Sequence, residues 1–159
     1  MTGPVAIVND VATGLSLSDR AKSLDSAVSN DQIYLSEFNE DVSHAYSETN
    51  GFRTGQVFLQ NGESYSGSMC GNKPEGSGSY IWPDGCKYEG EWQSGMRHGY
   101  GKLQWPSGAL YEGEFSGGYM NGNGTYSRPD NTIYKGRWRL NLKHGLGNQS
   151  YPNGVVLEG

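Results

Sequence analysis

Apolar and polar residues alternate along short segments of this chain, and glycines keep fixed places within the alternation. In Tyr88-Glu-Gly-Glu-Trp92 the rings and the glycine fall at every second position, with the two glutamates between them. This period of two is typical of a strand with one buried face. A second segment, Tyr100–Trp105, alternates less cleanly. Together the segments predict a β-hairpin with a connecting loop over residues 93–99.

The hairpin pattern recurs every 23 residues without an insertion, starting at residues 65, 88, 111, 134 and 157. Glycines also recur at the twelfth and fourteenth positions of the unit, and proline recurs at the nineteenth. This register predicts an array in which each unit packs mainly on its neighbours. The residues that define the first strand of each unit are Tyr65, Gly67, Tyr88, Gly90, Trp92, Tyr111, Gly113, Phe115, Tyr134 and Gly136.

Two kinds of turn are expected between the strands. The eighth position of the unit holds only Gly or Asn, residues that tolerate a positive φ. Between units, Trp82-Pro-Asp-Gly85 and Trp105-Pro-Ser-Gly108 predict type I turns, with Pro second and Gly fourth. Both turns suit antiparallel neighbours.

Glycine weakens a strand unless something replaces its missing side chain, and a ring on a neighbouring strand can do so. We therefore predict an all-β fold: an elongated, single antiparallel sheet of 23-residue β-hairpin repeats, preceded by a disordered N-terminal leader. Each unit adds two strands and advances about 9.6 Å along the array.

The charge and composition change where the repeats begin. Residues 1–64 carry nine acidic and three basic side chains, and residues 65–159 carry eight and nine. Low hydrophobicity with net charge favours disorder. The predicted parts are an acidic leader (1–50), a half-repeat that starts the sheet (51–64), four repeats (65–87, 88–110, 111–133 and 134–156) and the opening of a fifth (157–159). In the leader, Arg20-Ala-Lys-Ser23 is either a basophilic phosphorylation site at Ser23 or a chance match.

The composition excludes several classes of protein. Only 34% of residues are hydrophobic, which argues against a thick core, and the two cysteines are too few for a disulfide framework. We find no signal peptide and no apolar run that would span a membrane. The expected location is cytoplasmic, with peripheral association at the cytosolic face of the plasma membrane. The net charge of −5 argues against nucleic acid as a partner.

Residues that elsewhere carry chemistry do not assemble into a site here. His98 and His144 fall in the same column two units apart, so we expect them in loops roughly 19 Å from each other, too far to share a metal. The Gly-x-Gly segments lack the third glycine and the strand-to-helix context of a dinucleotide site. We predict no catalytic and no metal-binding residues.

The unit Tyr-x-Gly-x-Trp…Gly-x-Gly…Trp-Pro-x-Gly resembles the MORN repeat (membrane occupation and recognition nexus), which forms extended β-hairpin sheets. Four longer segments are similar to the N-terminal region of plant phosphatidylinositol 4-phosphate 5-kinases: Ser18–Asp25, Asn61–Gly67, Gly113–Met120 and Tyr134–Gly147. In that family the array precedes a lipid-kinase domain that uses ATP and magnesium. The resemblance implies a non-catalytic regulatory region of such a kinase, truncated before the kinase domain and without a cofactor of its own.

The fourth unit concentrates basic residues, and their alternation predicts a cation row on one strand face. Such a row suits an anionic phospholipid surface containing phosphatidic acid or phosphoinositides, at about 1 kcal/mol per basic residue. The predicted lipid-binding residues are Lys135, Arg137, Trp138, Arg139, Lys143 and His144.

Two other readings of the array remain open. The basic face can simply be solvated, discouraging edge-to-edge aggregation. Alternatively, the ring-rich array is a protein–protein interaction scaffold, either one that binds the kinase domain of its own parent or one with no kinase parent.

Overall fold

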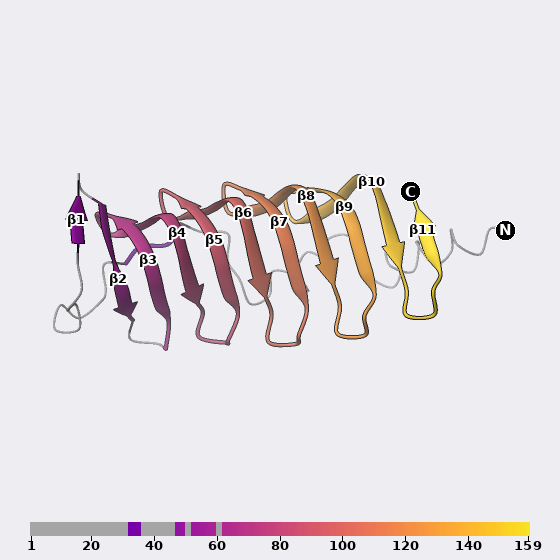
Figure 1. The fold of residues 1–159 in the computed structure, drawn as a ribbon, viewed down its shortest axis with the longest axis horizontal. Coiled ribbons are helices and arrows are strands. Elements are labelled where there is room, and N and C mark those ends of the chain that lie inside the picture. The colour runs from indigo at the N-terminus through magenta and orange to yellow at the C-terminus, as the bar shows by residue number, and fades with distance from the viewer. Residues whose placement is uncertain (1–31, 36–46, 50–51, 60–61) are drawn as a thin grey trace.

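The computed structural model describes residues 32–35, 47–49, 52–59 and 62–159. The described part contains one antiparallel sheet whose eleven strands follow one another in sequence order along the long axis of the molecule (Figure 1). This confirms the predicted all-β array. The candidate phosphorylation site at Ser23 lies outside the described residues. The strands are β1 (Ser47–Thr49), β2 (Phe52–Phe58), β3 (Ser64–Cys70), β4 (Lys73–Ile81), β5 (Lys87–Gln93), β6 (Met96–Gln104), β7 (Leu110–Ser116), β8 (Tyr119–Ser127), β9 (Ile133–Arg139), β10 (Leu142–Ser150) and β11 (Val156–Glu158).

The second strand of each hairpin is longer than predicted. In the second unit β6 begins at Met96, so the loop expected over residues 93–99 shortens to Ser94 and Gly95, whose φ angles are 51° and 80°. The prediction that His98 and His144 are loop residues is therefore wrong, because they lie in β6 and β10. The strand can continue because Gly99, with a φ of 62°, forms a bulge at the register shift opposite Gly90 and Glu91.

A continuous row of glycines crosses the sheet, and each glycine pairs with the next one on the neighbouring strand. We call it the glycine row: Gly55, Gly67, Gly78, Gly90, Gly101, Gly113, Gly124, Gly136 and Gly147. A Cβ at Gly90 would stand 2.5 Å from the Cα of Gly101. The strands therefore pack here with no room for side chains on the buried face.

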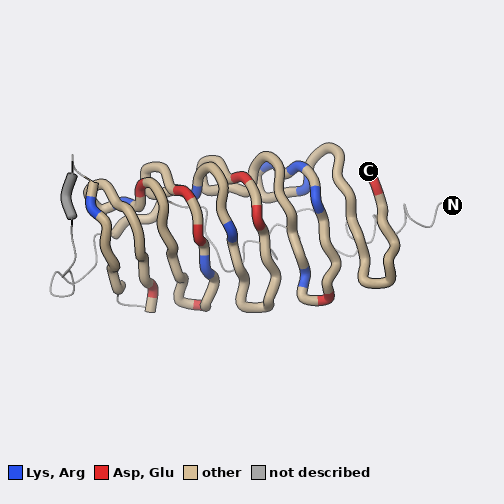
Figure 2. Tube along the Cα trace, in the orientation of Figure 1, with Lys and Arg blue, Asp and Glu red and all other residues tan. Residues whose placement is uncertain are grey.

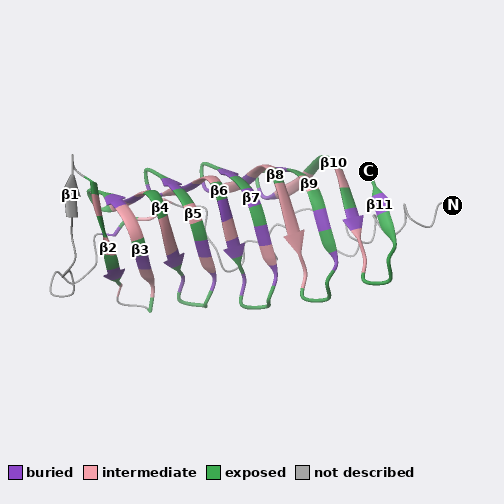
Figure 3. Ribbon diagram, viewed as in Figure 1, coloured by how far each residue is buried: buried purple, intermediate pink, exposed green. Residues whose placement is uncertain are grey.

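The buried face, which we call the ring face, is built from tyrosines that cover the glycine row. A Cβ at Gly101 would overlap the phenol of Tyr88, whose hydroxyl donates to the carbonyl of Glu91 at 2.7 Å. The same contact joins Tyr111 to Gly124. Rings of successive units meet edge to face, with the centroids of Tyr88 and Phe115 5.0 Å apart. Figure 3 shows the resulting buried bands across the central strands.

The turns between units have the hydrogen bond that is typical of a type I turn. The amide of Gly85 donates to the carbonyl of Trp82 at 3.0 Å, and Gly108 donates to Trp105 at the same distance. In the first of these turns the Asp84 carboxylate also accepts from the amide of Cys86 at 2.9 Å. These short turns hold consecutive units in register.

Part of the segment expected as leader lies against the hairpin turns, a contact that the sequence did not indicate. The amide of Leu35 donates to the carbonyl of Asn72 at 2.5 Å, and Ile33 donates to Gly95 at 2.8 Å. Leu35 is fully buried in the core. The next turn carbonyl, that of Gly118, is bound by the buried Arg97 guanidinium, whose Nε lies 3.0 Å away. The carbonyls of three successive hairpin turns thus accept hydrogen bonds, two from Gln32–Leu35 and one from Arg97.

Candidate functional site

The face opposite the rings, which we call the charged face, changes sign along the array. In the second and third units its strands carry Glu89, Glu91, Glu112 and Glu114, whereas β9 carries Lys135 and Arg137 at the corresponding positions. Figure 2 shows acidic segments over the middle of the array and basic segments on β9. The units have the same backbone arrangement, but the charge that they present on this face differs.

Strand β9 places its basic side chains in solvent and its rings in the core. Lys135, Arg137 and Arg139 are exposed, while Tyr134 and Trp138 are buried. In the described part of the chain, the one close ion pair joins Lys87 to Glu89 at 2.6 Å. No carboxylate there forms an ion pair with the basic residues of β9, so their charge is available to an external anion.

The structure divides the six predicted lipid-binding residues between the two faces. His144 lies across from Arg137 on β10, which adds it to the exposed group. Trp138 is only 2% exposed on the ring face and donates its indole N–H to the carbonyl of Gly124 at 3.3 Å. Lys143 also turns to the ring face, where its Nζ lies 4.7 Å from the centroid of the Tyr134 ring. The sequence grouped Trp138 with the exposed cations, but on β9 its ring is buried on the opposite face.

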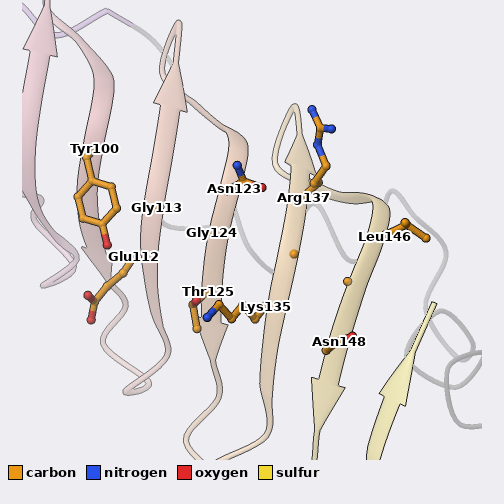
Figure 4. Close-up of a pocket in the computed structure, with 12 residues that line it drawn as sticks. Tyr100, Glu112, Gly113, Asn123, Gly124, Thr125, Lys135, Arg137, Leu146 and Asn148 are labelled. Carbon is orange, nitrogen blue, oxygen red and sulfur yellow. The ribbon is translucent and has the colours of Figure 1, made fainter.

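Two of the exposed cations, Lys135 and Arg137, line a shallow depression of about 660 Å³ over the glycine row (Figure 4). The two cations stand on either side of Gly136, where a side chain would point to the ring face, so the charged face is open between them. The other lining residues come from β6, β7, β8 and β10: Tyr100, Glu112, Gly113, Asn123, Gly124, Thr125, Leu146, Gly147 and Asn148. The sequence pattern could have indicated part of this lining. The thirteenth and fifteenth positions of a unit lie on either side of the fourteenth-position glycine, and they hold Asn123, Thr125, Leu146 and Asn148.

The glutamates of the charged face have a role that sequence reasoning missed. The Glu91 carboxylate accepts a hydrogen bond from the backbone amide of Tyr100 at 2.7 Å. In the third unit the Glu114 carboxylate accepts from the amide of Asn123 at 2.5 Å. Each amide directly follows a bulge glycine. The bulge thus turns a backbone N–H toward the charged face, where an oxyanion satisfies it.

Other candidate chemistry finds no site in the described residues. Within 32–35, 47–49, 52–59 and 62–159, no cluster of three or more His, Cys, Asp or Glu side chains is placed to hold a metal ion. Burial, reinforced by Asp84, raises the pKa of the Cys86 thiol to about 12, so it is a poor nucleophile. The same described part has no helix long and apolar enough to cross a membrane.

Comparisons with known proteins agree with the repeat arrangement of the sheet. The MORN repeat family is matched by four consecutive segments, residues 65–87, 88–110, 111–133 and 134–156. Over 77 residues the chain is 55% identical to phosphatidylinositol 4-phosphate 5-kinase 9 of Arabidopsis thaliana. The match covers 48% of this chain and 9% of the kinase, so the chain spans a small part of that relative.

Among solved structures, the chain is similar to the SAS-4 (dCPAP) TCP domain of Drosophila melanogaster in complex with a proline-rich motif of Ana2 (dSTIL). The identity is 12% and the TM-score 0.42, over 68% of this chain and 58% of that one.

Proposed function

The chain belongs to the MORN-repeat family, and from this premise we propose that it is the non-catalytic MORN region of a phosphatidylinositol phosphate kinase. The observation that carries the proposal is the 55% identity over 77 residues to a plant kinase that phosphorylates phosphatidylinositol 4-phosphate, as its name states. In this proposal ATP and magnesium are used by the kinase domain of the parent protein. The isolated chain should give no turnover in a phosphatidylinositol 4-phosphate phosphorylation assay, and turnover above background would contradict this.

We further propose that the fourth unit holds the region on anionic lipid at the cytosolic face of the plasma membrane. Support comes from Lys135, Arg137 and Arg139, which are exposed on one strand with no ion-pair partner in the described part of the chain. Three cations at about 1 kcal/mol each give weak, reversible attachment to phosphatidic acid or phosphoinositides. Glu89, Glu91, Glu112 and Glu114 oppose a flat approach, so contact should be limited to the basic end of the array.

Liposome flotation tests the lipid proposal. Arg137→Glu/Arg139→Glu should abolish flotation with vesicles that contain phosphatidic acid. The matched control, Lys87→Glu/Lys102→Glu, changes the net charge equally but lies on β5 and β6, away from the fourth unit. We expect the control to float nearly as well as the wild type. Equal loss in both variants would show that only net charge matters, and equal flotation of all three would remove the fourth unit as the lipid site.

A second candidate function is a protein-binding scaffold, possible with or without a kinase parent. It is favoured by large apolar side chains on the charged face, with Leu146 79% and Tyr100 59% exposed. Apolar contacts of this kind survive high salt, whereas surface-charge attraction to lipid is screened. The kinase domain of the related plant enzyme is the natural first bait. Salt-resistant capture would favour the scaffold, and release by 0.5 M salt would favour the electrostatic reading.

A further inference from the structure

The repeat has an oxyanion-binding feature that units two and three occupy with their own side chains. A bulge glycine, Gly99 or Gly122, adopts a positive φ and directs the next amide toward the preceding strand. A glutamate carboxylate from that strand then accepts the N–H, from Glu91 to Tyr100 and from Glu114 to Asn123. The two bonds are the same contact, made 23 residues apart in the sequence.

The fourth unit keeps the bulge but lacks the carboxylate. Gly145 has a φ of 64°, close to the 62° of Gly99, so the amide of Leu146 is directed as that of Tyr100 is. The position of the glutamate is taken by Arg137. A cation here cannot accept the hydrogen bond, and it adds positive charge beside the donor instead.

The space that the carboxylate fills in the other units is open here. A Cβ placed on Gly99 would collide with the Glu91 carboxylate, and one on Gly122 would lie 2.7 Å from that of Glu114. At Gly145 the same test atom meets nothing within 4 Å. This opening borders the depression lined by Lys135, Arg137 and Leu146 (Figure 4).

We propose that the fourth-unit bulge is a binding site for a carboxylate of an acidic peptide side chain, held by the Leu146 amide and the Arg137 guanidinium. The glutamates of units two and three are internal stand-ins for this ligand, since they place a carboxylate on the equivalent amide. Arginine adds a charge-assisted bond that those units lack. Lys135, on the other side of the glycine row, attracts further acidic residues of the same peptide. The site shares Arg137 with the lipid proposal but does not depend on it, because it operates without a membrane.

The first unit shows why the feature is special to the fourth. Ser68 stands in the glutamate position there, and a Cβ on Gly76 would lie 3.3 Å from the Ser68 Cβ. That bulge therefore has neither an internal carboxylate nor a cation beside it. We expect anion binding at the fourth unit alone.

Nuclear magnetic resonance of the ¹⁵N-labelled full chain tests the site through the Leu146 amide. Ac-Gly-Glu-Gly-NH₂ is titrated at constant ionic strength, with Ac-Gly-Gln-Gly-NH₂ as the matched neutral peptide and inorganic phosphate as a third probe. We expect the Glu peptide to move the Leu146 amide proton downfield in a saturable way. The amides of Tyr100 and Asn123, already bound internally, should not move. The Gln peptide should have no effect.

Two variants make the result specific. Arg137→Glu restores the internal carboxylate, so the Leu146 amide should appear downfield without ligand and stop responding to the Glu peptide. Arg137→Gln should weaken the response at least tenfold while leaving the shifts of the other units in place, which shows that the fold is retained. A Leu146 amide that ignores the Glu peptide, or responds equally in Arg137→Glu, overturns the proposal. A response to phosphate alone assigns the site to phosphate instead and overturns the carboxylate.

Discussion

The phenol of Tyr88 covers Gly101 so closely that a methyl group on that glycine would overlap the ring, while the Tyr88 hydroxyl donates to the carbonyl of Glu91 at 2.7 Å. The tyrosine thus fills the place of the missing side chain, and its hydroxyl also binds a carbonyl of its own strand. Because the contact recurs in each unit, it is the element from which the array is built.

Gly101→Ala should therefore destabilise the array strongly, although alanine usually suits a strand better than glycine. Overpacking costs typically 1–3 kcal/mol, and here the nearest atoms to the added methyl all belong to the buried phenol of Tyr88, so we expect the upper part of that range. The free energy of unfolding by urea measures it. In a Tyr88→Ala background the added methyl has room, and the cost of Gly101→Ala should fall to less than half. Equal costs in both backgrounds would contradict the ring–glycine packing.

The sequence predicted this packing because its signal is periodic. Rings and glycines fall in register over four units, and strand alternation then assigns them to one face, as Tyr88 and Gly90 demonstrate. The order of the strands followed from the same period, because the short turns between units place consecutive hairpins side by side in the sheet. Repetition supplied the evidence that a single copy would lack.

Features that depend on one non-repeating contact could not be predicted. Gln32–Leu35 has no periodicity, and its amides bind the turn carbonyls of Asn72 and Gly95, which only the folded array presents. His98 was placed in a loop because a glycine bulge cannot be distinguished from a loop glycine in the sequence. The glutamates of the charged face were recognised as outward-facing, but their bonds to bulge amides require the three-dimensional register.

Removing a bulge carboxylate should destabilise its unit. Glu114→Ala leaves the amide of Asn123 without its acceptor, and we expect the free energy of unfolding to fall by about 1–2 kcal/mol. Glu112→Ala is the matched control on the same strand and face, and should change it by less than about 0.5 kcal/mol. Hydrogen exchange localises the effect, because the Asn123 amide should exchange faster in Glu114→Ala only. Equal loss in the two variants would point to charge rather than to the bulge bond.

The contact between the leader segment and the array should contribute measurably to stability. Leu35 is fully buried, so Leu35→Ala should lower the free energy of unfolding by about 2–4 kcal/mol. Leu146→Ala provides the matched control, since that leucine is 79% exposed and should be nearly neutral. The amides of Ile33 and Leu35 should be protected from hydrogen exchange in the wild type and lose protection in Leu35→Ala. Rapid exchange of both amides in the wild type would show that the segment does not dock.

The two cysteines should differ in reactivity, and the difference should report on folding. Cys70 is exposed, whereas Cys86 is buried and its thiol has a pKa raised to about 12, mainly by burial. Iodoacetamide at pH 8 should alkylate Cys70 in the native chain and reach Cys86 only after urea is added. Because the folded pKa lies above the ordinary value of 9.0, the stability contributed by the neutral thiol is complete below pH 9 and declines as the pH rises toward 12. Cys86→Ala should remove the part of the alkaline loss of stability that comes from this thiol, and Cys70→Ala, the matched control, should leave it unchanged. Fast native alkylation of Cys86 at pH 8 would contradict its placement in the core.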